Sequence, residues 1–272
     1  MGCAILAGVL ESCGKTRLAG IEPRITRFIA CVNSEASVKR LNNRFKADSE
    51  RLTVLAQQNA SAMKDADIIV LACKPYMIDA ILGAEGVREA LQGKLVISVL
   101  VGTPPAKLHA AIGDTAAARP CFTVRAMPNL AAELGESMTV IETTELPGDY
   151  MEITDWIFLQ LGNTSLVAPD LYNVGGVLAG ASGAFISVAL DGIFDAAVNQ
   201  GIKRPEARKI MAQSLIGLAR LLESGNTPDM LREKISSPRG TTIEGLMSLE
   251  EDRVRYAFTK AVVQAVKRSK SI

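Results

Sequence analysis

The sequence has little of what several common chemistries require. Its 272 residues include one histidine, His109, so neither a histidine-based catalytic triad nor a histidine cluster for a metal is available. Thirty basic and twenty-nine acidic residues nearly cancel. Composition therefore implies no basic face for a polyanion. We expect no metal centre and no nucleic-acid partner.

The cysteines are few and form no recognisable framework. There is no Cys-x-x-Cys pair, and no histidine stands beside any of the five, which are Cys3, Cys13, Cys31, Cys73 and Cys121. Such a set fits neither a zinc site nor a disulfide scaffold. We predict five reduced thiols, packed as small core residues of an intracellular protein.

Signals for a membrane or for export are also missing from the pattern. We count no apolar run that reaches the ~18 residues of a membrane span. The first residues lack the charged start and the long apolar stretch of a signal peptide. We therefore expect a cytoplasmic location and no membrane partner.

What the sequence does contain is an alternation of short apolar, β-branched runs with helical patterns over the first two-thirds of the chain. Helical spacing is clear over residues 34–45 and 76–91. Alternation of this kind predicts a doubly wound parallel α/β sheet of Rossmann type. The predicted strands are 27–32, 67–73, 95–100, 122–127, 137–143 and 164–168.

The pattern changes near Pro169, after which no convincing strand is found. We therefore predict two domains, 1–168 and 169–272, the second all-helical. The stretch 174–194 is so apolar that it needs cover on most of its surface, and we expect a second subunit to supply it. A homodimer, or a larger assembly built from dimers, follows. The predicted helices are 170–201 with a break near Gly180–Gly183, 205–224, 227–235, and one or two within 240–268.

Two features resemble functional motifs but are better explained structurally. The stretch GVLESCGKT, residues 8–16, has five residues between Gly8 and Gly14 where a phosphate-binding P-loop has four. We predict a helix end followed by a turn. His109 is predicted to be a solvated residue on a surface helix.

Three turns could bind a ligand. Asn33 and Ser34 follow a predicted strand, where they could face the ribose of a dinucleotide or simply cap the next helix. Lys74 and Pro75 follow another strand, and a lysine there is either a ligand or a solvated side chain. In ISSPRGTTIEGL, residues 235–246, the hydroxyls and backbone donors could cap a helix or hold an anion.

Together these turns resemble the pyrroline-5-carboxylate reductase family, over residues 1 to about 268. The family's Ala-x-Lys-Pro matches Ala72, Lys74 and Pro75, and its Met-Pro-Asn matches Met127, Pro128 and Asn129. Its Ser-Pro-Gly-Gly-Thr-Thr matches residues 237–242, with Arg239 in place of the first glycine. The order and spacing of these motifs make the resemblance specific.

The resemblance implies an N-terminal NADPH domain, with NADH as a second possible cofactor, and a helical domain that interlocks two subunits. It implies that the substrate meets Ser237, Gly240, Thr241 and Thr242, with Thr242 as the catalytic hydroxyl. The residues it implies for the cofactor are Asn33, Ser34, Asn59, Ala72, Cys73, Lys74, Pro75, Val101, Met127 and Asn129.

The sequence departs from the family pattern in three places. Family members open with an apolar strand and Gly-x-Gly-x-Met-Gly, whereas Met1–Leu6 matches only the end of that loop and the helix behind it. We expect the first strand and the phosphate-binding glycines to be missing, through truncation, a misplaced start, or a real loss of cofactor affinity. Gly183 replaces a family proline and is expected to loosen a turn. The family's Thr-Pro after Asn129 is also missing.

Three functions are compatible with these observations. The first is NAD(P)H-dependent reduction of 1-pyrroline-5-carboxylate, a cyclic imine, to L-proline. The second is reduction of a related cyclic imine. The third is a truncated homologue without catalysis that only dimerises.

Overall fold

The computed structural model describes residues 1–113 and 121–271 and divides the chain into two compact units. The first comprises Met1–Gly180 with Arg268–Ile272, and the second Ala181–Lys267. The change between units therefore falls inside a helix, twelve residues beyond the predicted domain boundary at 168, which stays a prediction.

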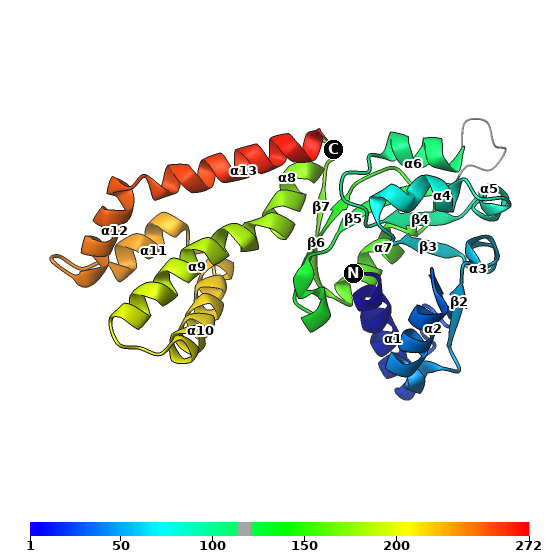
Figure 1. Ribbon diagram of the computed structural model, residues 1–272, viewed down its shortest axis with the longest axis horizontal. Coiled ribbons are helices and arrows are strands. Elements are labelled where there is room, and N and C mark those ends of the chain that lie inside the picture. Colours follow the sequence, from blue (N-terminus) through cyan, green and yellow to red (C-terminus); the bar gives the residue numbers. More distant parts are fainter. Residues whose placement is uncertain (114–120, 272) are drawn as a thin grey trace. The chain divides into compact units, whose positions relative to one another are not determined.

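The first unit alternates strands and helices along the chain (Figure 1). Its elements are α1 Gly2–Leu18, β1 Phe28–Val32, α2 Glu35–Arg44, η1 Lys46–Asp48, β2 Leu52–Ala56, α3 Asn59–Asp65, β3 Ile68–Leu71, η2 Pro75–Met77, α4 Ile78–Leu82, α5 Val87–Ala90, β4 Leu95–Ser98, α6 Pro105–Ile112, β5 Phe122–Met127, η3 Leu130–Leu134, β6 Ser137–Glu142, α7 Tyr150–Leu159, β7 Gly162–Val167, α8 Tyr172–Gly176 and η4 Val177–Ala181.

The strands form two sheets. One contains β1 and β2, and the other contains β3, β4, β5, β6 and β7 in that order. All neighbouring pairs are parallel except β5 with β6. The predicted parallel α/β sheet is thus confirmed, with one antiparallel pair, and β2 is a strand that the sequence reading missed.

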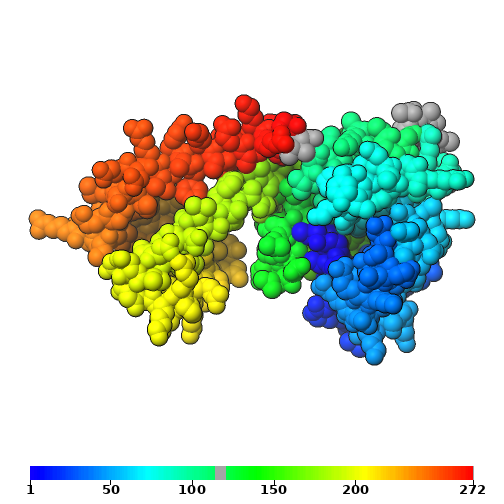
Figure 2. All heavy atoms as spheres, in the orientation of Figure 1, coloured from blue at the N-terminus to red at the C-terminus, as the bar shows by residue number. Residues whose placement is uncertain are grey.

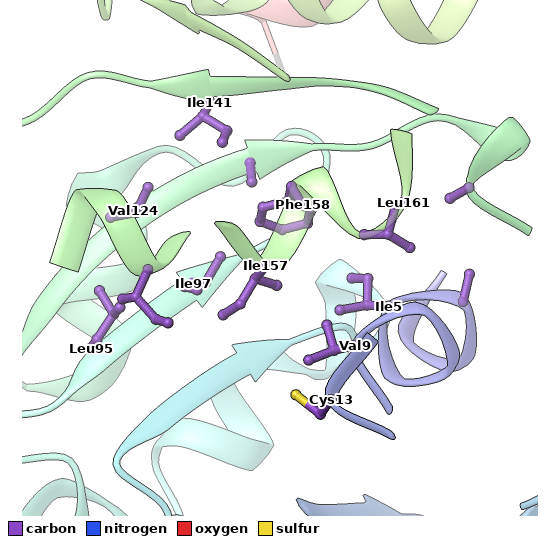
Figure 3. Close-up of a cluster of buried hydrophobic side chains, with 14 residues drawn as sticks. Ile5, Val9, Cys13, Leu95, Ile97, Val124, Ile141, Ile157, Phe158 and Leu161 are labelled. Atoms are coloured by element: carbon purple, nitrogen blue, oxygen red, sulfur yellow. The ribbon is translucent and has the colours of Figure 1, made fainter. Parts of the chain in front are cut away.

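Both faces of the larger sheet are covered, as β4 shows. Leu95 and Ile97 point into a core shared with α1 and α7, where Phe158 is fully buried (Figure 3). Val96, on the opposite face, packs with residues of α3, α4, α5 and α6. Since both faces are buried, β4 is apolar over nearly its whole length, which explains why it could be predicted.

The two sheets end at free edges within the described residues. β1 pairs only with β2, and β3 pairs only with β4. The first strand that the family pattern places before α1 would lie beside strands of this kind. The structure places β1 and β3 in separate sheets, while the missing first strand stays a prediction from the sequence.

The segment 8–16 is not a helix end followed by a turn, as we predicted, because α1 continues to Leu18. Its glycines permit close packing. A side chain at Gly8 would lie 2.8 Å from the carbonyl oxygen of Gln160, and one at Gly14 would lie 3.2 Å from Arg51 Nη2. No P-loop forms here.

Two further local predictions were wrong. His109 on α6 is not solvated: it is half-buried, and its Nε2 lies 3.0 Å from Thr123 Oγ1 on β5. The helix predicted over 76–91 divides into η2, α4 and α5. Gly86, with a left-handed φ of 77°, separates α4 from α5.

The second unit contains helices only in its described residues. Apart from the last residue of η4, they are α9 Ser182–Asn199, α10 Arg204–Glu223, α11 Pro228–Ile235, α12 Thr241–Glu251 and α13 Val254–Lys270, whose last residues belong to the first unit. Pro205 lies in the first turn of α10 and Gly225 follows its end with φ of 91°, as the sequence predicted.

The predicted break near Gly180–Gly183 does not occur. The segment Val177–Ala181 is a π-helical turn, and α8, this turn and α9 run as one helix from Tyr172 to Asn199. Gly183 therefore lies inside a helix rather than in a turn, with no atom within 4 Å of a side chain placed there.

This helix also corrects the expectation that no apolar run could span a membrane. It has 28 residues and a mean hydropathy of 1.8 over its most apolar window, and by length and composition it could cross a bilayer. Very little of that window is buried inside this chain. A helix that packs against another subunit meets the same two conditions.

Candidate functional site

The carboxyl ends of β3, β4 and β5 lie along one edge of the larger sheet. Leu71 is in register with Ser98, and Ser98 with Arg125. The turns that follow these strands, at Ala72–Pro75, Val101 and Met127–Asn129, are thus brought to the same edge. Ligands of open α/β sheets bind at this edge.

The turn after β3 presents Lys74 to solvent. Pro75 begins η2, and the Lys74 carbonyl accepts a hydrogen bond from the Met77 amide at 2.9 Å. The Lys74 side chain is exposed, whereas Cys73 is half-buried. Burial raises the pKa of the Cys73 thiol, so this group is neutral at physiological pH and the only charge in the turn is that of Lys74.

The start of α1 lies against the same turn. A side chain at Gly2 would come within 3.0 Å of the Ala72 Cβ, so glycine permits a close approach here. No side chain caps α1. In Figure 2 the first residues of α1, in dark blue, lie at the surface beside the cyan segment that follows β3. An uncapped helix start with free amides suits a phosphate group.

The ends of β1 and β2 are joined by side chains. Ser34 is the N-cap of α2 and accepts a hydrogen bond from the Ser37 amide at 3.3 Å. Gln57 donates from Nε2 to the Asn33 carbonyl at 2.9 Å, and Asn59 begins α3. Capping is therefore a real role of Ser34, while ligand binding by Asn33, Ser34 and Asn59 stays a prediction.

The turn after β5 is the most constrained of the set. The Asn129 amide nitrogen donates to Ser137 Oγ at 3.1 Å, its Oδ1 accepts from the Ala131 amide at 3.0 Å, and its Nδ2 donates to the Ala179 carbonyl at 3.1 Å. Met127, two residues earlier, packs against Gly176. The Ser137 hydroxyl of β6 and the Ala179 backbone carbonyl of η4 thus hold this turn in place.

The predicted substrate loop lies in the second unit, between α11 and α12. Arg239 has φ of 61°, a left-handed conformation that glycine adopts readily, and it stands where the family has glycine. Gly240 lies close to Ser237, because a side chain there would come within 2.4 Å of Ser237 Oγ and 3.0 Å of its carbonyl oxygen. The Gly240 amide donates to the Ser237 carbonyl at 3.0 Å and closes the turn.

The loop ends at an uncapped helix. Gly240 is the N-cap of α12, and no side chain caps that helix. Thr241 is exposed, whereas Thr242 is half-buried and lines an apolar hollow of about 310 Å³. Its apolar lining comes from Leu218, Leu222, Pro228, Leu231, Ile235 and Leu246. Both the free amides and the Thr242 hydroxyl therefore remain available to a small anionic substrate.

The predicted cofactor residues lie in the first unit and the predicted substrate residues in the second. Sequence reasoning missed Gln57, which adopts φ of 54°, and the buried pair of Arg125 and Glu142. Nothing in the local sequence marks Gln57. For Arg125, a charged residue inside an otherwise apolar strand was the available signal.

Comparisons with known proteins identify the same family as the motifs. The family profile "Pyrroline-5-carboxylate reductase dimerisation" matches residues 169–272, and "NADP oxidoreductase coenzyme F420-dependent" matches residues 1–102. A pyrroline-5-carboxylate reductase from Lophium arboricola is 35% identical over 281 residues, covering 97% of this chain and 88% of the relative.

Solved structures share the fold. The pyrroline-5-carboxylate reductase from Coxiella burnetii superposes with a TM-score of 0.80 at 24% identity, covering 98% of this chain and 94% of that chain. The Plasmodium falciparum pyrroline carboxylate reductase, solved with NADP bound, gives 0.74 at 22% identity, covering 90% of this chain and 97% of that chain. With a full-length relative at 35% identity and a Rossmann-like domain followed by a helical dimerisation domain, the chain belongs to the pyrroline-5-carboxylate reductase family.

Proposed function

We propose that this protein reduces 1-pyrroline-5-carboxylate to L-proline, with NADPH as the hydride donor and NADH as a second possible donor. The observation that carries the proposal is the full-length match to a pyrroline-5-carboxylate reductase at 35% identity. The loop Ser237–Thr242, retained at the uncapped start of α12, supports it further.

The residues present fit a dinucleotide at the sheet edge. The free amides at the start of α1, beside Ala72, would hold phosphate oxygens, and Asn33, Ser34 and Asn59 would face the adenosine half. Cys73, Lys74, Pro75, Val101, Met127 and Asn129 would line the path toward the reacting ring. When bound, NADPH supplies the hydride, so the protein's task is to position the reactants.

The substrate is an anion with a C=N bond, and the loop offers a partner for each part. Amides of Thr241 and the residues after it would bind the carboxylate at the helix start. The Thr242 hydroxyl would hydrogen-bond the imine nitrogen. Hydride adds to the imine carbon and a proton to the nitrogen, which gives the secondary amine; Thr242 would donate that proton or hold the water that does.

Thr242→Ala tests this assignment. We expect kcat with pyrroline-5-carboxylate and NADPH to fall about 100-fold, the usual effect of losing a proton-transfer group. Thr16→Ala is the matched control, because the Thr16 hydroxyl donates to the Ser12 carbonyl within α1, in the first unit. Unchanged turnover in Thr242→Ala would remove Thr242 from the mechanism.

A substrate panel separates the first two candidate functions. Pyrroline-5-carboxylate is compared with six-membered cyclic imine carboxylates and with imines that lack a carboxylate. We expect the carboxylate-free imines to react much more slowly, because the helix start would then bind nothing. Faster reduction of a six-membered imine would favour the related reductase.

A titration with NADPH separates both from a protein that only dimerises. Because the edges of β1 and β3 are unpaired, we also propose a variant in which an apolar strand and a Gly-x-Gly loop precede Met1. We expect this extended protein to bind NADPH more tightly than the 272-residue chain. If neither protein binds, the cofactor assignment is wrong.

We infer a homodimer, or a larger assembly of dimers, located in the cytoplasm. The dimerisation profile over residues 169–272 supports assembly. Five free thiols agree with a reducing compartment. The apolar helix Tyr172–Asn199 would then be covered by the partner subunit rather than by lipid.

A further inference from the structure

A buried ion pair lies on β5 and β6, beside the turn that the proposed mechanism uses. Arg125 donates to Glu142 through two parallel hydrogen bonds, Nε to Oε2 at 2.7 Å and Nη2 to Oε1 at 2.5 Å. Only 12% of the Arg125 side chain and 8% of the Glu142 side chain are exposed. Burying such a pair costs desolvation energy, so stability alone does not account for it.

The pair is covered by an aromatic ring from α8. The Arg125 Cζ lies 4.2 Å from the centre of the Tyr172 ring, and Tyr172 is buried. Burial raises the pKa of the Tyr172 phenol, Arg125 opposes that rise and Glu142 adds to it, so the phenol is neutral at physiological pH. The ion pair on the sheet thus holds the Tyr172 ring, and with it the first residue of α8.

The next turn of the same helix packs closely on the sheet through two glycines. A side chain at Gly175 would come within 2.9 Å of Val140 Cγ1, and one at Gly176 within 2.4 Å of Met127 Sδ. Met127 and Val140 are partners in the antiparallel register of β5 and β6. The helix therefore lies directly on these strands, closer than a side chain at either glycine would allow.

One turn further on, the helix reaches the candidate site. The Ala179 carbonyl, in the π-helical turn, accepts the hydrogen bond from Asn129 Nδ2 at 3.1 Å. Three contacts thus follow one another along the helix. Tyr172 contacts Arg125, Gly176 contacts Met127, and Ala179 contacts Asn129. A π-helical turn frees carbonyls from the regular ladder, which suits this use of Ala179.

We propose that Arg125, Glu142 and Tyr172 are positioning residues that set the place of Met127 and Asn129 for hydride transfer. This inference rests on the proposed function for its catalytic part. The ion pair and ring fix the start of the helix, and the helix fixes the amide of Asn129. We call Arg125, Glu142 and Tyr172 the clamp. Loss of the clamp displaces the turn that holds Met127 and Asn129. A displacement of about 1 Å at a reacting group can cost about 100-fold in rate.

The test uses the full chain with Glu142→Gln, Arg125→Lys, and the double variant Arg125→Met with Glu142→Met. The double variant leaves no charge unpaired and keeps the fold where a single change could unfold it. Two readouts are taken: amide hydrogen exchange over residues 127–135, and kcat and KM with pyrroline-5-carboxylate and NADPH. Arg24→Met with Glu152→Gln is the matched control, because that pair is exposed on the same unit.

We expect faster exchange of the Asn129 and Ala131 amides in all three variants and not in the control. We expect kcat to fall about 10- to 100-fold with KM changed less than about threefold. Adding Asn129→Ala to the double variant should lower kcat no further than Asn129→Ala alone, because both act through one group.

Unchanged exchange over 127–135 in the double variant would overturn the inference, whatever the activity. Fully additive effects with Asn129→Ala would also overturn it. If the wild-type protein does not reduce pyrroline-5-carboxylate, the proposed function fails, and the exchange measurement still decides whether the clamp positions the turn.

Discussion

The two units differ most in how much apolar surface each buries by itself. In the first, a sheet covered on both faces leaves Val87, Leu95, Val96, Leu108 and Phe158 with almost no exposure. In the second, Ala207 and Leu231 are the buried hydrophobic residues among those described, and α9, α12 and α13 bury none. The first unit has a core of its own, whereas the second displays the side of a core that another subunit must complete.

The largest effect on assembly is expected from a charge on the exposed apolar surface of the second unit. Val188 on α9 is 75% exposed in the single chain. In Val188→Glu a carboxylate would have to be buried at the subunit interface, so we expect dissociation to monomers, with Kd raised about 100-fold or more. Sedimentation velocity measures the change.

Leu18→Glu supplies the control for that variant. Leu18, at the end of α1, is 90% exposed and belongs to the first unit. We expect its assembly to match that of the wild type. Dissociation in both variants, or in neither, would contradict the contrast between the two surfaces.

A cavity in the first unit should lower its stability and leave the assembly unchanged. Phe158 is fully buried between α7 and the sheet. We expect Phe158→Ala to lower the free energy of unfolding of this unit by about 3–5 kcal/mol, through lost contacts and the cavity left behind. Urea titration measures it, and the variant should remain a dimer at low denaturant. A variant that becomes monomeric would show that the units are not independent in this respect.

A smaller effect is expected in the predicted substrate loop, Ser237–Thr242. Arg239 has a left-handed φ of 61°, which costs most residues about 1 kcal/mol. Arg239→Gly should therefore raise the free energy of unfolding by up to about 1 kcal/mol. Arg208→Gly, in the second turn of α10, should lower it by about the same amount, since glycine is unfavourable inside a helix. Equal signs for the two variants would contradict this explanation.

The smallest effect concerns pH. Burial raises the pKa of the Cys13 thiol, while a backbone hydrogen bond and Arg51 oppose the rise. A raised pKa in the folded state means that the contribution to stability is complete below the unfolded pKa of about 9.0 and is lost as pH rises through the folded value. We expect unfolding free energies of Cys13→Ala to fall less steeply above pH ~9 than those of the wild type. Parallel curves would reject the effect.

Much of the fold was predictable because its signals are local. β4 is buried on both faces and reads as a continuous apolar run, and α10 carries Pro205 and Gly225 at its ends. β2 was missed because its five residues include an exposed threonine and are only partly buried. The break near Gly180–Gly183 was misjudged because the π-helical turn Val177–Ala181 keeps the helix continuous where glycines suggest an end.

The candidate site was predictable where its residues stand next to a strand or a helix in the sequence. This is true of Lys74 after β3, of Asn129 after β5, and of the loop 237–242 at the start of α12. The contacts of Asn129 with Ala179 and of Arg125 with Glu142 could not be predicted. The two residues of each pair are 50 and 17 positions apart in the chain, respectively.

The sequence by itself determined the alternation of strands and helices, the change to an all-helical second part, and the order of the motifs, because periodicity and turn chemistry act over a few residues. Tertiary structure alone decided that α1 packs through its glycines and that a charged pair fixes α8 beside Met127 and Asn129. These features depend on contacts between distant segments, which only the folded chain brings within bonding distance.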